Sequence, residues 1–232
     1  MNLWAIADLH LPFSADKSHD IFEGFENYTE KIEKNFKTFV KRDDTVVIPG
    51  DISWAENLKS SAPDFLFLDS LPGIKIISKG NHDRWWAGTT KINAFFAEHG
   101  IHSIKIVNNN HYTFGKYGIC ATRGWDFLGE TEHDEKLIRR EAMRLENSVL
   151  SAVNEGLQPI VFLHYPPITI NGRIPEFFEI FKKYGVKKVY YGHLHGKKAH
   201  AMAFLGERAG IDFDLVSSDF VQFCPKIILQ NM

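Results

Sequence analysis

The run Leu3-Trp4-Ala5-Ile6-Ala7, closed by Asp8-Leu9-His10, shows the pattern that predicts the fold of this chain. The apolar run is typical of a buried strand, and residues two apart on an extended chain face the same way. Polar clusters recur at or near turns further along the chain, mostly after short apolar runs: Gly50-Asp51, Gly80-Asn81-His82-Asp83, His164 and Gly192-His193-Leu194-His195. Because the carboxyl ends of neighbouring strands in an open α/β sheet border one crevice, we expect these clusters to converge.

Each cluster taken alone has an ordinary structural explanation. An Asp after a strand is usually turn chemistry, Gly-Asn suits a tight turn, and a lone His such as His164 is more often a hydrogen-bonded buried residue than a ligand. Five such clusters together are not explained by independent turns. They offer seven oxygen and nitrogen donors with no cysteine, too many for one tetrahedral zinc and about the number for two divalent metals that share a carboxylate. These donors belong to Asp8, His10, Asp51, Asn81, His164, His193 and His195.

The order of these motifs, D-x-H, G-D, G-N-H-[DE], H and G-H-x-H, runs from residue 8 to residue 195. It resembles the calcineurin-like metallophosphoesterase superfamily. The resemblance implies that His82 is not a ligand but touches the scissile phosphate and protonates or stabilises the leaving oxygen. It also implies two ligand sets with one shared residue: Asp8, His10 and His195 for the first metal, Asn81, His164 and His193 for the second, and Asp51 as the bridge.

The chemistry of such a site is reasonable by itself. Two cations about 3.5–4 Å apart lower the pKa of a bridging water and hold the phosphate for in-line attack by a bridging hydroxide. Asn81 adds a ligand oxygen without charge, and an imidazole such as that of His82 suits proton transfer near neutral pH. Carboxylate, amide and imidazole ligands accept Mn²⁺, Fe, Zn²⁺, Co²⁺ or Ni²⁺, so the identity of the two divalent metal ions stays open.

The second motif departs from the protein phosphatases of the superfamily, which carry G-D-x-x-D-R. Here Asp51 is followed by Ile52-Ser53-Trp54-Ala55, so the Asp that orients the catalytic His and the Arg that binds phosphate are missing at their places. The sequence therefore indicates a phosphohydrolase of another branch, and it leaves the partner of His82 unidentified.

Neighbouring residues carry weaker signals. Asp83 could support the site from behind, but we favour it as the cap of a helix that starts near Arg84. Arg84 and Arg123 are interpreted as surface residues rather than phosphate contacts. Trp85-Trp86 either line a pocket or pack at the start of that helix.

Size and composition limit the other classes of function. With 232 residues and 44% hydrophobic content the chain can bury a sizeable core, and a site that needs both Asp8 and His195 predicts one domain over 1–232. A net charge of −2 gives no general attraction to nucleic acid, so none is expected as a partner, and no protein partner is implied. Two cysteines, no signal-like amino terminus and no apolar run long enough for a membrane predict a cytoplasmic protein without membrane contact.

Alternation of apolar runs and amphipathic stretches favours parallel strands joined by helices. Strands are expected at 2–7, 44–49, 74–78, 159–163 and 187–191, and helices at 18–41, 56–70, 86–99, 130–154 and 174–184. Short β-like runs within 111–122 and 199–229 are expected as added strands. The resemblance implies a four-layer α/β/β/α sandwich with two mixed β-sheets and the metal site at the strand carboxyl ends.

The sequence thus predicts a dinuclear metal-dependent phosphoester hydrolase with a small phosphodiester or phosphomonoester as substrate. The rival is a catalytically silent binding or scaffold protein with the same fold. Such a protein is expected to lose ligands or the His82 position, and none is missing here. A metal-dependent amidase or peptidase would not need His82.

Overall fold

The fold was obtained as a computed structural model, which describes residues 1–15, 24–126 and 131–230. The elements in chain order are β1 (Leu3–Ala5), α1 (Tyr28–Phe39), β2 (Thr45–Pro49), the 3₁₀ helix η1 (Lys59–Ser61), α2 (Ala62–Ser70), β3 (Ile74–Ser78), α3 (Thr89–Glu98), β4 (Ile104–Ile106), β5 (His111–Phe114), β6 (Tyr117–Thr122), α4 (Glu132–Val153), β7 (Gln158–Leu163), β8 (Ile168–Thr169), β9 (Gly172–Arg173), α5 (Pro175–Lys183), β10 (Lys188–Tyr191), α6 (Gly196–His200), β11 (Gly206–Arg208), β12 (Ile211–Leu215) and β13 (Lys226–Leu229).

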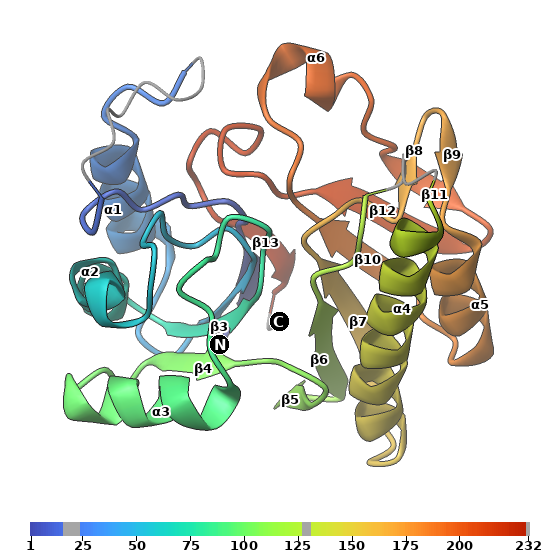
Figure 1. Cartoon of the computed structure of the whole chain (residues 1–232), viewed down its shortest axis with the longest axis horizontal. Coiled ribbons are helices and arrows are strands. Elements are labelled where there is room, and N and C mark those ends of the chain that lie inside the picture. The colour runs from blue at the N-terminus through green and yellow to red at the C-terminus, as the bar shows by residue number, and fades with distance from the viewer. Residues whose placement is uncertain (16–23, 127–130, 231–232) are drawn as a thin grey trace.

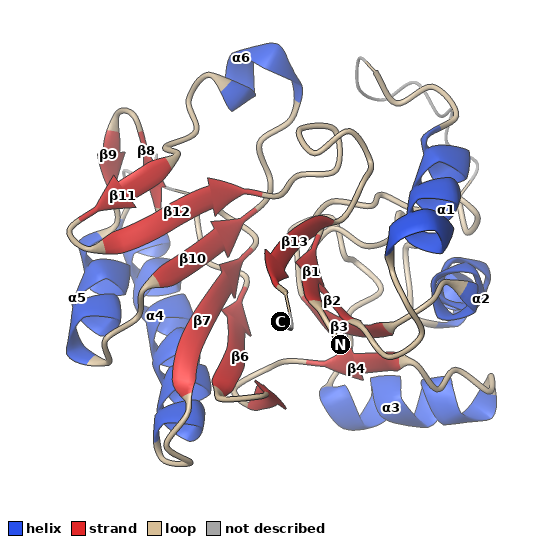
Figure 2. Cartoon of the chain, turned by 180° about the vertical axis from the view of Figure 1, so that it is seen from behind, coloured by secondary structure: helices blue, strands red, loops and turns tan. Residues whose placement is uncertain are grey.

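Two mixed sheets form the centre of the molecule (Figure 2). One has the strand order β13-β1-β2-β3-β4, and the other has the order β11-β12-β10-β7-β6-β5. The inner strands of each sheet pair in parallel, whereas β13, β11 and β5 pair antiparallel at the edges. The carboxyl ends of these parallel strands, and the loops that follow them, therefore lie at the same end of each sheet.

The helices cover the outer faces of the two sheets. Figure 1 shows α1, α2 and α3 around the first sheet and α4 and α5 against the second. Alternation along β2 explains the layering: Val46 and Ile48 join the apolar cluster beneath α1–α3, whereas Val47 joins the cluster between the sheets. A third cluster lies beneath α4 and α5. The predicted α/β/β/α sandwich with two mixed sheets is therefore confirmed.

The five predicted strands and the five predicted helices are all present, most of them with shifted ends. The first predicted helix, 18–41, is observed as α1 from Tyr28 onward, and its positions 18–23 lie outside the described residues, as does position 130 of the fourth. The second was predicted to begin at 56 but α2 begins at Ala62, with Pro63 in its first turn, where a missing N–H costs nothing. The short elements β4, β8, β9, α6 and β13 were not predicted individually.

Lys75, in β3, is fully buried and serves the end of helix α2. Its Nζ donates to the carbonyl oxygens of Leu71 at 2.6 Å and Gly73 at 2.8 Å, which the helix end would otherwise leave without donors. Burial lowers the pKa of Lys75 from 10.5 to about 8.

The folding stability is therefore expected to depend on pH through Lys75. The unfolded chain keeps the Lys75 proton up to about pH 10.5, whereas the folded chain loses it near pH 8. Because the unfolded state binds more protons in this window, stability should rise with pH there, by up to about 3 kcal/mol. Urea denaturation from pH 7.5 to 10.5 checks this: the rise should be absent from Lys75→Met and kept in the exposed control Lys34→Met. Parallel pH profiles for wild type and Lys75→Met would contradict it.

No helix within the described residues combines the length and the apolar character needed to cross a membrane.

Candidate metal centre

Five strands of the two sheets deliver the predicted residues to one place. Asp8 follows β1, Asp51 follows β2, Asn81 follows β3, His164 follows β7 and His193 follows β10. Figure 2 shows the arrowheads of β7 and β10 running in the same direction, toward the loops between the sheets. All seven donors predicted from the sequence meet there.

The first group consists of Asp8, His10 and His195, whose ligand atoms all lie within 4.8 Å of one another. The Nε2 atoms of His10 and His195 are 3.3 Å apart, and His195 Nε2 lies 3.9 Å from Asp8 Oδ1. Asp8 and His10 are buried, while His195 is partly accessible. This group could hold one metal ion.

The second group consists of Asp51, His164 and His193, again with ligand atoms within 4.8 Å of one another. His193 Nδ1 lies 3.2 Å from His164 Nε2. The side-chain oxygen of Asn81 approaches the same His164 nitrogen to 2.5 Å, so the amide joins this group. The second group could hold a second ion.

Asp51 lies between the two groups. Its Oδ2 is 3.7 Å from His10 Nε2 in the first group and 3.6 Å from His164 Nε2 in the second. Its Oδ1 accepts a hydrogen bond of 2.8 Å from the backbone N–H of His82. One carboxylate oxygen is thus held by the backbone, and the other faces both groups.

The backbone at the site adopts an uncommon conformation. Asp8, His10, Asp51 and His193 have φ values of 60°, 46°, 51° and 72°, in the left-handed region that non-glycine residues seldom occupy. Such conformations cost free energy and persist where the surroundings determine them, which is frequent at functional sites. The ligand positions are therefore fixed by backbone turns as well as by side-chain packing.

Two glycines of the motifs permit the close approach of these turns. A Cβ atom on Gly80 would lie 2.1 Å from Asp51 Oδ1, and one on Gly192 would lie 2.5 Å from Asp8 Oδ2. Neither position has room for any side chain. The carboxylates of Asp51 and Asp8 occupy the space that a side chain would need at Gly80 and Gly192, which explains why glycine precedes Asn81 and His193.

The residues present fit metal ions. Asp8 Oδ1 is buried and accepts no hydrogen bond, with His164 Nδ1 at 3.4 Å and His195 Nε2 at 3.9 Å, and two pairs of imidazole nitrogens face each other at 3.2–3.3 Å. Buried polar atoms are normally satisfied, so atoms left in this state point to a cation that would accept their lone pairs. The donor set of carboxylate, imidazole and amide suits divalent transition metals.

The protonation states of the free site agree with this assignment. Burial lowers the pKa of His193 to about 3, so its imidazole is neutral and can act as a ligand. Burial raises the pKa of Asp8, but His195 and His164 hold it below its usual range. Although burial disfavours charge on His164, the carboxylates of Asp51 and Asp8 raise its pKa to about 9. Metal binding would therefore release the His164 proton.

Residues 1–197 match the family model described as calcineurin-like phosphoesterase. The chain belongs to this family. No curated protein matches the chain.

Solved structures share the fold at low sequence identity. Phosphopantetheinyl hydrolase from Mycobacterium tuberculosis is 15% identical with a TM-score of 0.53, covering 99% of this chain and 96% of that chain. A protein of unknown function from Aquifex aeolicus is 16% identical with a TM-score of 0.50, covering 97% and 95%. A further structure reaches a TM-score of 0.60 at 13% identity over 99% of both chains. At these identities the likeness supports the fold alone.

Trp54 stands where the protein phosphatases of the family have the second Asp of G-D-x-x-D-R. Its ring stacks on His10, with centroids 4.6 Å apart at 21°, and meets His82 edge to face at 4.7 Å. The sequence could not identify the residue that positions His82. The aromatic contact from Trp54 restrains the His82 ring beside the first group.

Asp83 does not cap a helix, so that prediction was wrong. Helix α3 begins only at Thr89, with Gly88 as its N-cap. The Asp83 carboxylate is buried and instead binds the two loops that carry the ligands, accepting hydrogen bonds of 2.7–3.3 Å from five N–H groups: the backbone of Gly80, Asp51, Ile52 and Ser53 and the indole of Trp85. Burial and the neighbouring Asp51 raise the pKa of Asp83 to about 7, which these five donors oppose.

Asp219 is a site residue that the sequence did not reveal. Its Oδ1 lies 3.0 Å from His195 Nδ1, and its Oδ2 accepts a 2.8 Å hydrogen bond from the backbone of Gly196. The carboxylate therefore fixes the His195 ring so that Nε2 faces the first group. Asp219 follows no recognised motif, and only its spatial position identifies it.

Weaker metal binding is the expected result of Asp219→Asn. A carboxylate behind a ligand imidazole commonly contributes 10–100-fold in metal affinity, because it orients the ring and raises its basicity. We expect a loss of about this size for one of two metal ions, measured by titration of metal-free protein. The exposed Asp212→Asn on strand β12 is the matched control. Unchanged affinity in Asp219→Asn would show that the contact does not serve the site.

The other residues singled out by sequence fall outside the metal groups. Arg84 is exposed and pairs with Glu56 at 2.9 Å, as expected for a surface residue. Trp85 is buried against Phe65, with ring centroids 4.7 Å apart, so packing is its role. Arg123, interpreted as a surface residue, is only partly exposed.

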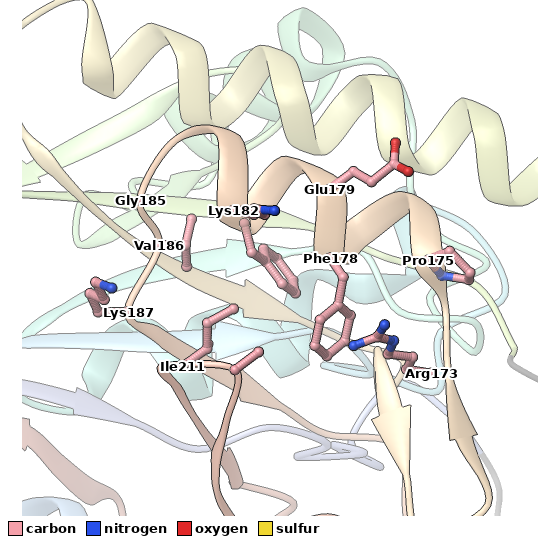
Figure 3. Close-up of a pocket in the computed structure, with 11 residues that line it drawn as sticks. Arg173, Pro175, Phe178, Glu179, Lys182, Gly185, Val186, Lys187 and Ile211 are labelled. Atoms are coloured by element: carbon pink, nitrogen blue, oxygen red, sulfur yellow. The ribbon is translucent and has the colours of Figure 1, made fainter.

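A cavity of about 480 Å³ lies away from the metal centre. Figure 3 shows its wall, formed by Phe178 of α5, Ile211 at the start of β12 and Lys187 just before β10. These are the amino ends of β10 and β12, opposite the edge that carries the ligands. The cavity has no part in the site.

Proposed function

We propose that this chain is a dinuclear metal-dependent phosphoester hydrolase that acts on a small phosphodiester or phosphomonoester. The observation that carries the proposal is the position of Asp51 Oδ2, 3.7 Å from a nitrogen of one group and 3.6 Å from a nitrogen of the other. A carboxylate that serves two cations at once is the feature that separates a two-metal site from two independent sites. Membership of the calcineurin-like phosphoesterase family supports the same activity.

The seven donors divide between the two ions in the proposal. Asp8, His10 and His195 hold the first ion, Asn81, His164 and His193 hold the second, and Asp51 bridges them. When bound, two divalent ions supply a nucleophilic water of lowered pKa and neutralise charge on the phosphate oxygens. The identity of the ions, among Mn, Fe, Zn, Co and Ni, is left to measurement.

His82 is proposed to contact the substrate phosphate and to donate a proton to the leaving oxygen. His82 lies beside the first group, 5.6 Å from the His10 ring between centroids, and its backbone N–H is fixed on Asp51. From there its imidazole would contact the scissile phosphate and give a proton to the leaving oxygen. The edge-to-face contact of Trp54 holds the His82 ring in place.

The rival proposal, a silent scaffold of the same fold, requires an incomplete site. All seven donors and His82 are present and gathered here. Since the ligands come from positions 8 to 195, we also propose that the whole chain acts as one domain.

The test of His82 is a comparison of leaving groups. His82→Ala should slow hydrolysis of an alkyl phosphate ester by about 10²–10⁴-fold, because the alkoxide needs a proton as it leaves. The same variant should affect p-nitrophenyl esters much less, because p-nitrophenolate leaves without one. Kinetics of both substrate types check this, with the exposed His102→Ala as control. Equal losses on both substrates would argue against proton donation by His82.

A further inference from the structure

A second, small cavity lies between the ends of strands β3 and β6, one from each sheet. Its volume is about 110 Å³, and Ser78, Lys79, Arg123, Glu141 and Arg144 are among its lining residues. This volume is well below the ~300 Å³ at which pockets for drug-sized ligands begin. It has room for a single acidic group with its waters and not for a nucleobase or a sugar.

The charge around this cavity is unbalanced. Three cationic side chains, Lys79, Arg123 and Arg144, face one carboxylate, Glu141, which is fully buried. Glu141 is already engaged by Arg144 at 2.8 Å and by the hydroxyl of Thr122 at 2.7 Å. Neither Lys79 nor Arg123 has a carboxylate within ion-pair distance in the described ranges 1–15, 24–126 and 131–230.

Two polar atoms at the cavity lack hydrogen-bond partners. The hydroxyl of Ser78, in a residue only 1% exposed, has none, and neither has Nε of Arg123. Both atoms can donate to an anion, and the majority of buried donors in proteins have a partner.

The cavity adjoins the second metal group through the chain itself. Ser78 and Lys79 directly precede Gly80 and Asn81, so the strand that forms the cavity wall continues into a ligand. On the other side, the carbonyl of Arg123 accepts a 2.9 Å hydrogen bond from the N–H of Tyr165. Tyr165 packs its ring on His193, with centroids 4.2 Å apart. Tyr165 therefore links the backbone of Arg123 to the ligand His193.

We propose that Ser78, Lys79 and Arg123, supported by Arg144, form a second anion subsite, so that the substrate carries a further phosphate or carboxylate beyond the scissile ester. The inference rests on the proposed function and narrows its substrate class from simple esters to compounds with two acidic groups. The guanidinium of Arg123 lies over the Trp125 ring, 4.4 Å from its centroid, and this contact fixes its orientation. A planar guanidinium held in this way can bind the distal acidic group. Glu141 accepts a hydrogen bond from Arg144 and offsets part of the positive charge, so the remaining charge suits one anion.

The test compares two ligands that differ only in a distal carboxylate. Isothermal titration calorimetry of metal-loaded protein measures the affinities of 3-phosphonopropionate and propylphosphonate, whose ratio is the preference for a second acidic group. Longer ω-phosphonocarboxylates then show which chain length spans the distance between the metal centre and the cavity. Wild type should bind the best of the phosphonocarboxylates at least about tenfold more tightly than its alkylphosphonate counterpart, as expected for a charge-assisted hydrogen bond. Arg123→Gln and, independently, Lys79→Gln should reduce this preference to about threefold or less. The exposed Arg139→Gln on helix α4 should keep it.

Equal affinities of wild type for both ligand types at every chain length would overturn the subsite, as would a preference that survives both Arg123→Gln and Lys79→Gln. Turnover of bis(p-nitrophenyl) phosphate by the same preparation is measured alongside. Absent turnover with a kept preference for the phosphonocarboxylate would refute the hydrolase and not the subsite, so the two failures are distinguishable. A phosphate tail in place of the carboxylate then separates the two kinds of distal group.

Discussion

Asp51→Asn is expected to lower phosphoesterase turnover by about a thousandfold or more and to reduce the bound metal from two ions to one or fewer per chain. The reason is the position of Asp51 Oδ2 between the two groups of donors. An amide cannot offer a negative oxygen to two cations, and the transition-state stabilisation of several kcal/mol that a two-metal site supplies depends on both.

The fold should tolerate this change. Asn keeps an oxygen at Oδ1, which accepts the hydrogen bond from the N–H of His82. Unfolding by urea should therefore be close to wild type while metal content and turnover fall. The exposed Asp43→Asn is the matched control. An Asp51→Asn protein that still holds two ions and turns over substrate would refute the bridging role.

Asp83→Ala is expected to have the largest effect on stability. The substitution removes the acceptor of five N–H groups, four of them in the backbone of the loops after β2 and β3. Donors left buried without partners cost about 1–3 kcal/mol each, and part of this cost is relieved by water or loop movement. We expect a loss of about 3 to 5 kcal/mol in the free energy of unfolding.

Urea denaturation of the metal-free protein measures this loss without the contribution of bound ions. Asp43→Ala, an exposed change of the same type, should stay within about 0.5 kcal/mol of wild type. If Asp83→Ala were as stable as this control, the network around Asp83 would not hold the loops together.

The sequence predicted the ligand set because the ligands follow the strands. A strand such as β2 is recognisable from Thr45-Val46-Val47-Ile48, and the donor after it must lie at the carboxyl end of a sheet. Asp219, in contrast, reaches His195 from a segment after β12 without a motif, so only the folded chain brings it there. The same holds for Trp54, whose contact with His82 depends on how the loop after β2 turns.

The error at Asp83 has a specific physical cause. An Asp before Arg84-Trp85-Trp86 has the local pattern of a helix cap. In the fold its carboxylate instead accepts hydrogen bonds from backbone N–H groups of its own loop and of the neighbouring loop. Short strands such as β4 and β13 were missed because three or four residues carry too little periodicity. The strands β4 and β13 form because they pair with β3 and β1, and this pairing is not visible in their local sequence.

Metal content and turnover, measured in one preparation, test whether the chain is a two-metal hydrolase. Wild-type protein is stripped of metal, reconstituted with Mn²⁺ and, in parallel, with Zn²⁺, Co²⁺, Ni²⁺ or Fe²⁺. Ions per chain are then counted, and hydrolysis of bis(p-nitrophenyl) phosphate and p-nitrophenyl phosphate is assayed beside Asp51→Asn. We expect two ions per chain and metal-dependent turnover that is lost in the variant. One ion or none per chain, with no turnover above Asp51→Asn for any of these metals, would contradict it.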